Sequence, residues 1–199
     1  MDETRVKVTI VGASPLLLHS DRGANPLSDE AKALKAVSSK RKKVEEDYAA
    51  MMQIEWSAGL YLDEKGRIAI PVENVRASVR DGAKLSKLGK EVSRKVFLDG
   101  EHIPLMYDGP NNPEKLFEDA RFRDVRSVRV GQQRVMRTRP IFRTWSLTFT
   151  AYWEPDAFDV DLFRQCLTSA GKFIGLGDFR PDKGGTFGRF VVESIEVQS

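Results

Sequence analysis

The chain has 199 residues, of which 31% are charged and 41% hydrophobic, and its formal net charge is +3. This length suits one domain with a sizeable core, so we expect a single domain over residues 1–199. One cysteine and two histidines exclude a disulfide framework and a histidine–cysteine metal cluster, and no apolar run approaches the roughly 20 residues that cross a bilayer. We therefore expect a cytoplasmic protein with no membrane partner, in which Cys166 is a buried structural thiol.

Positive charge is concentrated in two segments, although the net charge is small. Between residues 121 and 143 there are eight arginines and one acid, Asp124, a local excess of seven positive charges. Residues 40–43, named here the lysine block, carry four more. Such segregation favours a face that binds a polyanion, because each phosphate that is neutralised releases counterions. The alternative is a solvated surface laced with salt bridges.

The N-terminal part of the chain predicts a strand and then a helical insertion. Residues 5–13 alternate apolar and polar side chains, which indicates a strand with one buried face. Ser28 is a suitable N-cap for a short helix that ends near Val37. Ser39 can cap a second helix, with the lysine block at its start. Residues from about 20 to 55 thus form the expected helical insertion.

The middle of the chain predicts a hairpin and an amphipathic helix. Residues 60–62 and 68–70 flank a turn that contains Gly66, as in a β-hairpin. The helix that follows Pro71 has an apolar line and also carries Arg76 and Arg80.

The arginine-rich segment predicts a second hairpin, named here the arginine hairpin, over about 121–143. Its strands are residues 124–130 and 135–142. The next strand, 145–153, alternates cleanly, so one face is expected in the core while Tyr152 lies on the open face. Its ring could stack on a base.

The C-terminal part predicts a helix over 159–174, a glycine-rich loop over 174–190 and a last strand. Nucleotide-binding loops run from strand to helix, so this helix-to-strand order excludes a Rossmann or Walker site. The glycines suit a tight turn or a close approach of a sugar–phosphate backbone, and Arg180 and Lys183 add charge. The glycines are Gly175, Gly177, Gly184, Gly185 and Gly188.

Without the insertions, the order of elements is strand, helix, two strands, helix, strand. This order predicts an α+β fold: a ferredoxin-like, RNA-recognition-type antiparallel sheet with helices on one face. The other face of the sheet is then free to bind a ligand.

Two stretches resemble the RAMP superfamily, which includes backbone subunits of CRISPR effector complexes. They are RIAIPVENVRASVRDGAK (67–84), with Val-Glu-Asn where the family usually has Gly-Ser-Ser, and IGLGDFRPDKGGTFGRFVV (174–192). The resemblance implies an RNA-recognition-type palm, a projecting hairpin, a glycine loop packed on the first helix, and subunits stacked along a nucleic-acid strand. The C-terminal motif also resembles bacteriophage proteins, which implies a single-strand-binding role in a bacterial or phage-infected cell.

Candidates for catalysis are scarce. His19 could mirror the general base of RAMP endoribonucleases, but it has no recognisable partner. We expect His102 to be a surface turn residue. Asp159 and its acidic neighbours are expected to form the cap and first turn of a helix. We therefore expect no enzyme activity, cofactor or metal.

The sequence favours sequence-independent binding of single-stranded nucleic acid by a homo-oligomer, with DNA preferred over RNA, in phage replication or recombination. The alternatives are a guide-RNA-binding subunit of a CRISPR-like complex, a metal-independent endoribonuclease, and a module that binds an acidic protein. The predicted nucleic-acid contacts are Lys40, Arg41, Lys42, Lys43, Arg76, Arg80, Arg126, Arg129, Arg134, Arg137, Arg139, Arg143, Tyr152, Arg180 and Lys183.

Overall fold

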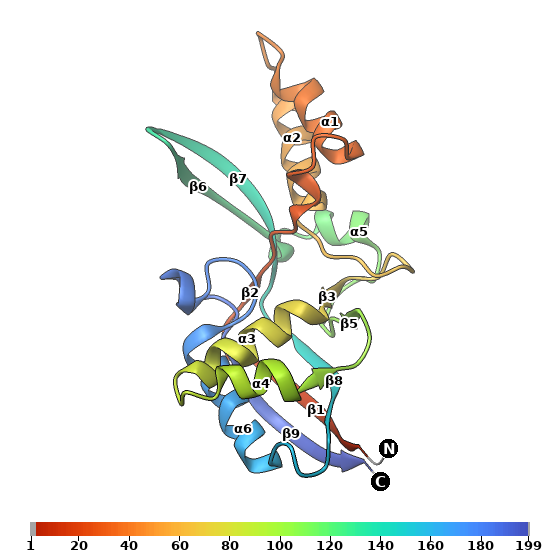
Figure 1. Ribbon diagram of the computed structural model, residues 1–199. Helices are drawn as coiled ribbons and strands as arrows, with labels where there is room; N and C mark the ends of the chain where they lie inside the picture. The colour runs from red at the N-terminus through yellow and green to blue at the C-terminus, as the bar shows by residue number, and fades with distance from the viewer. Residues whose placement is uncertain (1–2, 199) are drawn as a thin grey trace. The chain divides into compact units, whose positions relative to one another are not determined.

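A computed structural model describes residues 3–198, which form two compact units of α+β structure (Figure 1). Unit 1 combines Met1–Leu16, Leu62–Asp108 and Arg143–Ser199, and unit 2 combines Leu17–Tyr61 and Gly109–Phe142. The expected helical insertion and the arginine hairpin therefore belong to the same compact unit, although about 50 residues of unit 1 separate them in the sequence.

Unit 1 is built on a four-stranded antiparallel sheet in the order β4–β8–β1–β9. The central strands are β1 (Thr4–Gly12) and β8 (Ser146–Trp153), and the edge strands are β4 (Phe97–Leu98) and β9 (Phe190–Gln198). The predicted first, penultimate and last strands of the chain are thus confirmed.

The alternation along β1 separates a buried face of the sheet from an open one. Val6, Val8 and Ile10 are fully buried, whereas Lys7 between them is exposed. Successive side chains of a strand point to opposite faces, and the helices of unit 1 cover the apolar face (Figure 1). The core of unit 1 therefore lies between one sheet face and one helical layer.

Three helices form this layer: α3 (Val72–Lys84), α4 (Gly89–Lys95) and α6 (Val160–Ser169). The helix predicted over 159–174 is shorter than expected, because its last turn, Ala170–Ile174, widens to a π-helical turn in which Gly175 N–H donates to Ala170 O at 2.8 Å. A Cβ on Gly82 would lie 2.5 Å from Ala170 N, so this glycine lets α3 pack closely on that turn.

Unit 2 contains a helical pair, α1 (Asp29–Ser38) and α2 (Glu45–Ala58), and a three-stranded sheet in the order β2–β7–β6. Its core surrounds the buried ring of Trp56, whose Nε1–H donates to Phe122 O at 2.8 Å. The strands are β2 (Leu16–Leu17), β6 (Arg123–Val130) and β7 (Gln133–Phe142), and the short helix α5 is Pro113–Glu118. Among the described residues, the short 3₁₀ turns are Asp21–Gly23 (η1) and Ala120–Phe122 (η2) in unit 2 and Pro181–Lys183 (η4) in unit 1.

The lysine block was predicted to start the second helix, and this was wrong. Ser39 is the C-cap of α1, and α2 begins only at Glu45, so the block is a loop between the helices. The reason is that the side chain of Asp47 accepts the backbone N–H of Val44 at 3.1 Å, which satisfies a free donor at the start of α2.

Two smaller predictions were also wrong. Residues 60–62 do not form a strand: only Leu62 bridges to Ile68, and β3 (Ala69–Pro71) pairs instead with β5 (His102–Pro104). His102 is therefore a strand residue rather than a turn residue.

The coarse fold class, α+β with antiparallel sheets, is confirmed. Among the described residues, no helix has the length and apolar character needed to span a membrane.

Candidate nucleic-acid interface

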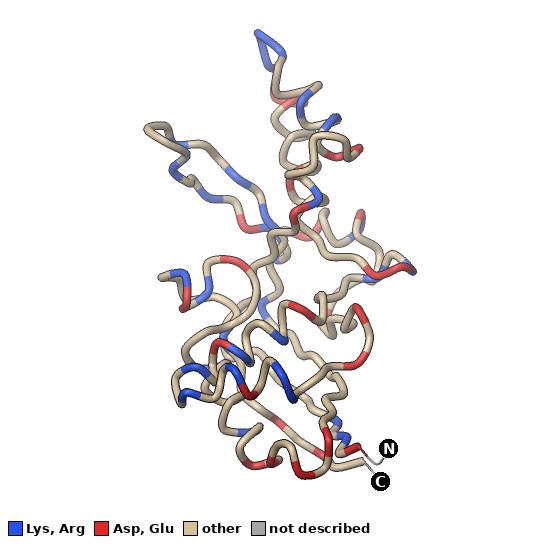
Figure 2. Tube along the Cα trace, in the orientation of Figure 1, with Lys and Arg blue, Asp and Glu red and all other residues tan. Residues whose placement is uncertain are grey.

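The arginine hairpin is formed by β6 and β7, and its register brings arginines together in cross-strand pairs. Arg126 lies opposite Arg137, and Arg129 lies opposite Arg134 near the two-residue turn. Figure 2 shows the basic residues distributed along both strands. Because the side-chain period of a strand is two, these two pairs point to opposite faces of the ribbon.

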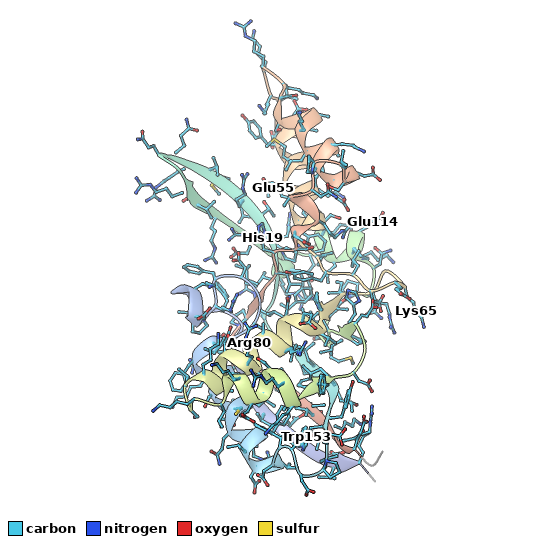
Figure 3. All side chains as sticks on the ribbon, in the orientation of Figure 1. His19, Glu55, Lys65, Arg80, Glu114 and Trp153 are labelled. Carbon is cyan, nitrogen blue, oxygen red and sulfur yellow. The ribbon has the colours of Figure 1, made fainter. Side chains whose placement is uncertain are left out.

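On the first face, Arg126 and Arg137 have acidic partners. Arg126 Nε donates to Asp124 Oδ2 at 2.6 Å, and Arg137 Nη1 donates to Glu55 Oε1 at 2.7 Å. The other oxygen of Glu55 accepts the backbone N–H of Thr138 at 3.1 Å. The two contacts of Glu55 tie β7 to α2 (Figure 3 labels Glu55), so they have a structural role.

On the second face the arginines have no acidic partner. Arg129 Nε donates to Gly131 O at 3.0 Å and Arg134 Nη1 to Ser127 Oγ at 3.5 Å, and neither forms an ion pair within the described residues. The side chains of Val125 and Met136 are exposed on the same face, at 45% and 59%. This face therefore offers positive charge beside apolar surface.

Other cations predicted to contact nucleic acid are those of the lysine block and Arg143, which follows β7. Lys40 Nζ contacts Asp47 Oδ1 at 2.6 Å, and this hydrogen bond is the main reason why the pKa of Asp47 is lowered. Arg41 and Lys42 are exposed at the tip of the loop. Arg143 is exposed beyond the end of β7, so it lies outside the hairpin.

The two arginines of α3 make contacts within unit 1. Arg76 donates to Ser93 O at 3.2 Å and lies 3.5 Å from Glu73, which links α3 to α4. Arg80 donates to both oxygens of Asp81 at 2.9 and 3.2 Å. Arg80 is thus partly neutralised.

Tyr152 lies on the open face of the unit 1 sheet, as predicted, but in a cluster that the sequence did not indicate. The Phe97 ring stacks on it with centroids 5.6 Å apart, and the guanidinium of Arg5 lies 4.9 Å from its centroid. Because β4 has only two residues, the strand pattern that would have placed Phe97 opposite Tyr152 is too short to recognise.

The glycine-rich loop is held together by its own backbone. A Cβ on Gly185 would lie 1.7 Å from Phe179 O, and one on Gly188 would lie 1.8 Å from Leu176 O. Ser78 Oγ donates to Gly175 O at 2.9 Å, which holds the start of the loop against α3. The approach of two limbs of the loop therefore accounts for these glycines without a ligand.

The charged residues of the loop are close to neutral as a group. Asp182 lies 3.5 Å from Arg180 and 3.2 Å from Lys183. Phe179 was not among the predicted contacts; its backbone has φ +49° and its ring is exposed. The Phe179 ring packs against Phe187 with centroids 6.3 Å apart, and its exposed surface is suitable for stacking on a base.

The two residues considered for catalysis, His19 and Cys166, lie in different surroundings. His19 is exposed (labelled in Figure 3), and its backbone carbonyl accepts a hydrogen bond from the Tyr61 hydroxyl at 3.1 Å. Cys166 is buried, which raises the pKa of its thiol, in agreement with a structural role. Within residues 3–198, no three histidine, cysteine, aspartate or glutamate side chains gather as metal ligands.

A scan against protein-family models and a search of curated proteins gave no match for this sequence.

Proposed function

We propose that this protein binds single-stranded nucleic acid with little sequence preference, and that the second face of the arginine hairpin is its principal contact. The observation that carries the proposal is the cross-strand pair of Arg129 and Arg134. Like charges directly opposite each other destabilise a hairpin. An anion between them removes this repulsion and gains charge-assisted hydrogen bonds.

The surroundings of this pair favour a nucleic-acid strand over a small anion. Val125 and Met136 extend the face along the ribbon with exposed apolar side chains, which suit contact with sugars and unpaired bases. The phosphates of a strand repeat, so successive arginines can each neutralise one and release counterions.

The open sheet face of unit 1 supports a single strand rather than a duplex. Phe97 and Tyr152 form a stacked pair there, and aromatic rings bind unpaired bases of any sequence. The strand order β4–β8–β1–β9, with α3 and α6 on one face, supports the ferredoxin-like, RAMP-type arrangement. In this proposal, copies of the chain share one strand of DNA during phage replication or recombination.

The test is equilibrium binding of a fluorescent single-stranded DNA to the Arg129→Ala/Arg134→Ala variant across a salt series. If each arginine neutralises one phosphate, the slope of log K against log salt falls by about 1.4. The matched control, Lys32→Ala/Lys35→Ala, removes the same charge from exposed positions on α1 and keeps the slope of the unaltered protein. Equal slopes for both variants would place the contact elsewhere.

The alternatives give different outcomes in the same assay. A guide-RNA-binding subunit prefers RNA, and an endoribonuclease shortens the RNA and loses that activity in His19→Ala. A module for an acidic protein binds neither nucleic acid.

A further inference from the structure

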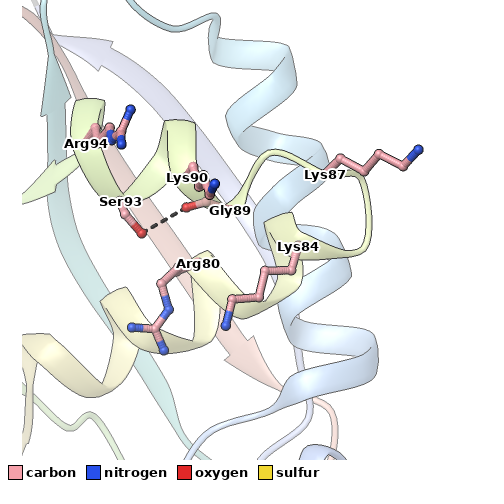
Figure 4. Close-up of a pocket in the computed structure, with 7 residues that line it drawn as sticks. All are labelled: Arg80, Lys84, Lys87, Gly89, Lys90, Ser93 and Arg94. Carbon is pink, nitrogen blue, oxygen red and sulfur yellow. Dashed lines mark hydrogen bonds between the residues drawn. The ribbon is translucent and has the colours of Figure 1, made fainter.

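A basic pocket of about 530 Å³ lies between α3 and α4, within unit 1 (Figure 4). It is open to solvent, and five of its lining side chains are cations. The lining residues are Arg80, Lys84, Lys87, Gly89, Lys90, Ser93 and Arg94. Only Arg80 among them was predicted as a contact for nucleic acid.

The positive charge of this pocket is incompletely compensated. Asp81 contacts the two cations that α3 contributes to the pocket, Arg80 at 2.9 Å and Lys84 at 2.7 Å, and the hydrogen bond from Arg80 is the main reason why the pKa of Asp81 is lowered. Within the described residues, Lys90 and Arg94 form no ion pair, and neither does Lys87. Asp81 therefore contacts two of the five cations, and Glu73 and Glu91 act on Arg80 and Arg94 only through charge interactions without a direct ion pair.

Two of the lysines stand at positions that local structure disfavours. Lys87 has φ +63°, and the hydrogen bonds Lys87 N–H to Lys84 O and Leu88 N–H to Ala83 O define a Schellman C-cap, where glycine is the usual residue. Lys90 lies in the first turn of α4, where a positive charge opposes the helix dipole. Helix capping therefore explains neither lysine.

The opposite side of α4 has a different character. Glu91 and Lys95 line a second pocket there, together with Asp156 and Asp159 of the segment that leads into α6. The excess of cations is thus confined to the side of α4 that faces α3.

The chemistry of the wall indicates the class of ligand. No aromatic ring lines the pocket, and the Ser93 hydroxyl already donates to Gly89 O at 2.8 Å. What remains is a set of guanidinium and ammonium donors, which match phosphate oxygens. Lys87 lines the pocket, and Figure 4 shows its side chain extending away from the loop and from the other labelled cations.

We propose that the α3–α4 pocket is a binding site for clustered phosphate groups, separate from the arginine hairpin. Adjacent phosphates of a nucleic-acid strand and a free oligophosphate present the same chemistry, and the variants below distinguish them. The site does not depend on the proposed function of the hairpin.

The probe is inorganic tripolyphosphate, titrated into the full chain at physiological salt and followed by amide chemical shifts and calorimetry. We expect saturable binding at one site with shifts at Lys90, Ser93 and Arg94. The Lys90→Ala/Arg94→Ala variant should weaken binding about tenfold or more, because charge-assisted hydrogen bonds are lost. The Lys32→Ala/Lys35→Ala control should bind as the unaltered protein does.

Lys87→Gly is a second variant that keeps the test informative if the double variant unfolds. Glycine fits the backbone at this position, so the melting temperature should stay equal or rise while tripolyphosphate affinity falls. Absence of saturable binding, or equal binding by the pocket variants and the control, would overturn the proposal.

Binding of single-stranded DNA by the same variants distinguishes the two sources of phosphate. If Lys90→Ala/Arg94→Ala weakens both tripolyphosphate and DNA, the site takes phosphates of the strand. If it weakens tripolyphosphate alone, the site takes a free oligophosphate. The hairpin variant Arg129→Ala/Arg134→Ala should leave tripolyphosphate binding unchanged, so a failure of the hairpin proposal remains distinct from a failure of this one.

Discussion

Arg129 and Arg134 lie directly opposite each other on the β6–β7 hairpin, with no carboxylate paired to either within the described residues. On the other face of the same ribbon, Arg126 and Arg137 also lie opposite each other, but Asp124 and Glu55 neutralise them. The hairpin therefore contains one arginine pair that stabilises unit 2 and one that is available to an anion.

The exposed pair of Arg129 and Arg134 should lower the stability of the hairpin and raise its affinity for single-stranded DNA. In Arg134→Glu an opposite-charge pair replaces the repulsive one, so we expect the free energy of unfolding to rise by about 0.2–1 kcal/mol. Affinity for single-stranded DNA should fall steeply, because the new carboxylate repels phosphates. Chemical denaturation and fluorescence anisotropy measure the two effects. A variant that loses stability, or that binds DNA as before, would contradict this account of the pair.

The open sheet face should contribute through stacking. Tyr152→Ala removes a ring that contacts both Phe97 and Arg5, and we expect DNA binding to weaken by about 1–3 kcal/mol per base stacked. The matched control is Thr148→Ala, which alters the same face of β8 without removing a ring. The two variants should be compared by titration at high salt, where phosphate contacts are weakened and stacking dominates. An equal effect of both substitutions would argue against stacking.

The loss of stability on substituting a glycine of the C-terminal loop should depend on the space around that glycine. At Gly188 a methyl group would lie 1.8 Å from Leu176 O, whereas at Gly184 it would meet nothing within 4 Å. Both have positive φ, so Gly184→Ala should cost about 1–2 kcal/mol from backbone strain alone. Gly188→Ala should cost more, because the backbone must also move. Thermal unfolding of both variants measures the two losses of stability. A larger loss for Gly184→Ala than for Gly188→Ala would mean that the two limbs of the loop do not approach each other as described.

Asp81 should make stability depend on acid pH. Its pKa is lowered in the folded state, mainly by the hydrogen bond from Arg80 and also by that from Lys84. A lowered folded pKa contributes stability that is present above the unfolded value of about 3.9 and is lost as pH falls through the folded value. Asp81→Asn should therefore be less stable at neutral pH and show a flatter loss of stability below about pH 4. Denaturant titrations at a series of pH values measure this, and parallel curves for both proteins would contradict it.

The course of the chain could be predicted from the sequence because burial imposes a period on each element. The alternation of residues 145–153 gave β8, and the arginine-rich segment gave the β6–β7 hairpin. The register of that hairpin could not be predicted. A turn one residue longer would place Arg129 opposite Val135 instead of Arg134, and the flanking residues permit either turn.

The start of a helix was predicted wrongly where two capping residues competed. Ser39 is a good N-cap residue, yet Asp47 and the acidic first turn of α2 moved the helix start to Glu45 and left the lysine block in a loop. The glycine-rich loop shows a different limit. A run of glycines indicates that backbones approach closely, but it does not tell whether the second backbone is a ligand or, as for Gly185 and Phe179, the loop itself.

The central claim, binding of a single strand through phosphates and stacking, is tested most directly by equilibrium binding of the unaltered protein. Fluorescent single-stranded DNA, single-stranded RNA and duplex DNA of equal length are titrated across a salt series, and gels check that the RNA stays intact. We predict the tightest binding to single-stranded DNA, with cooperative and steeply salt-dependent isotherms. Equal or tighter binding to the duplex, or no binding to any of the three, would contradict the account.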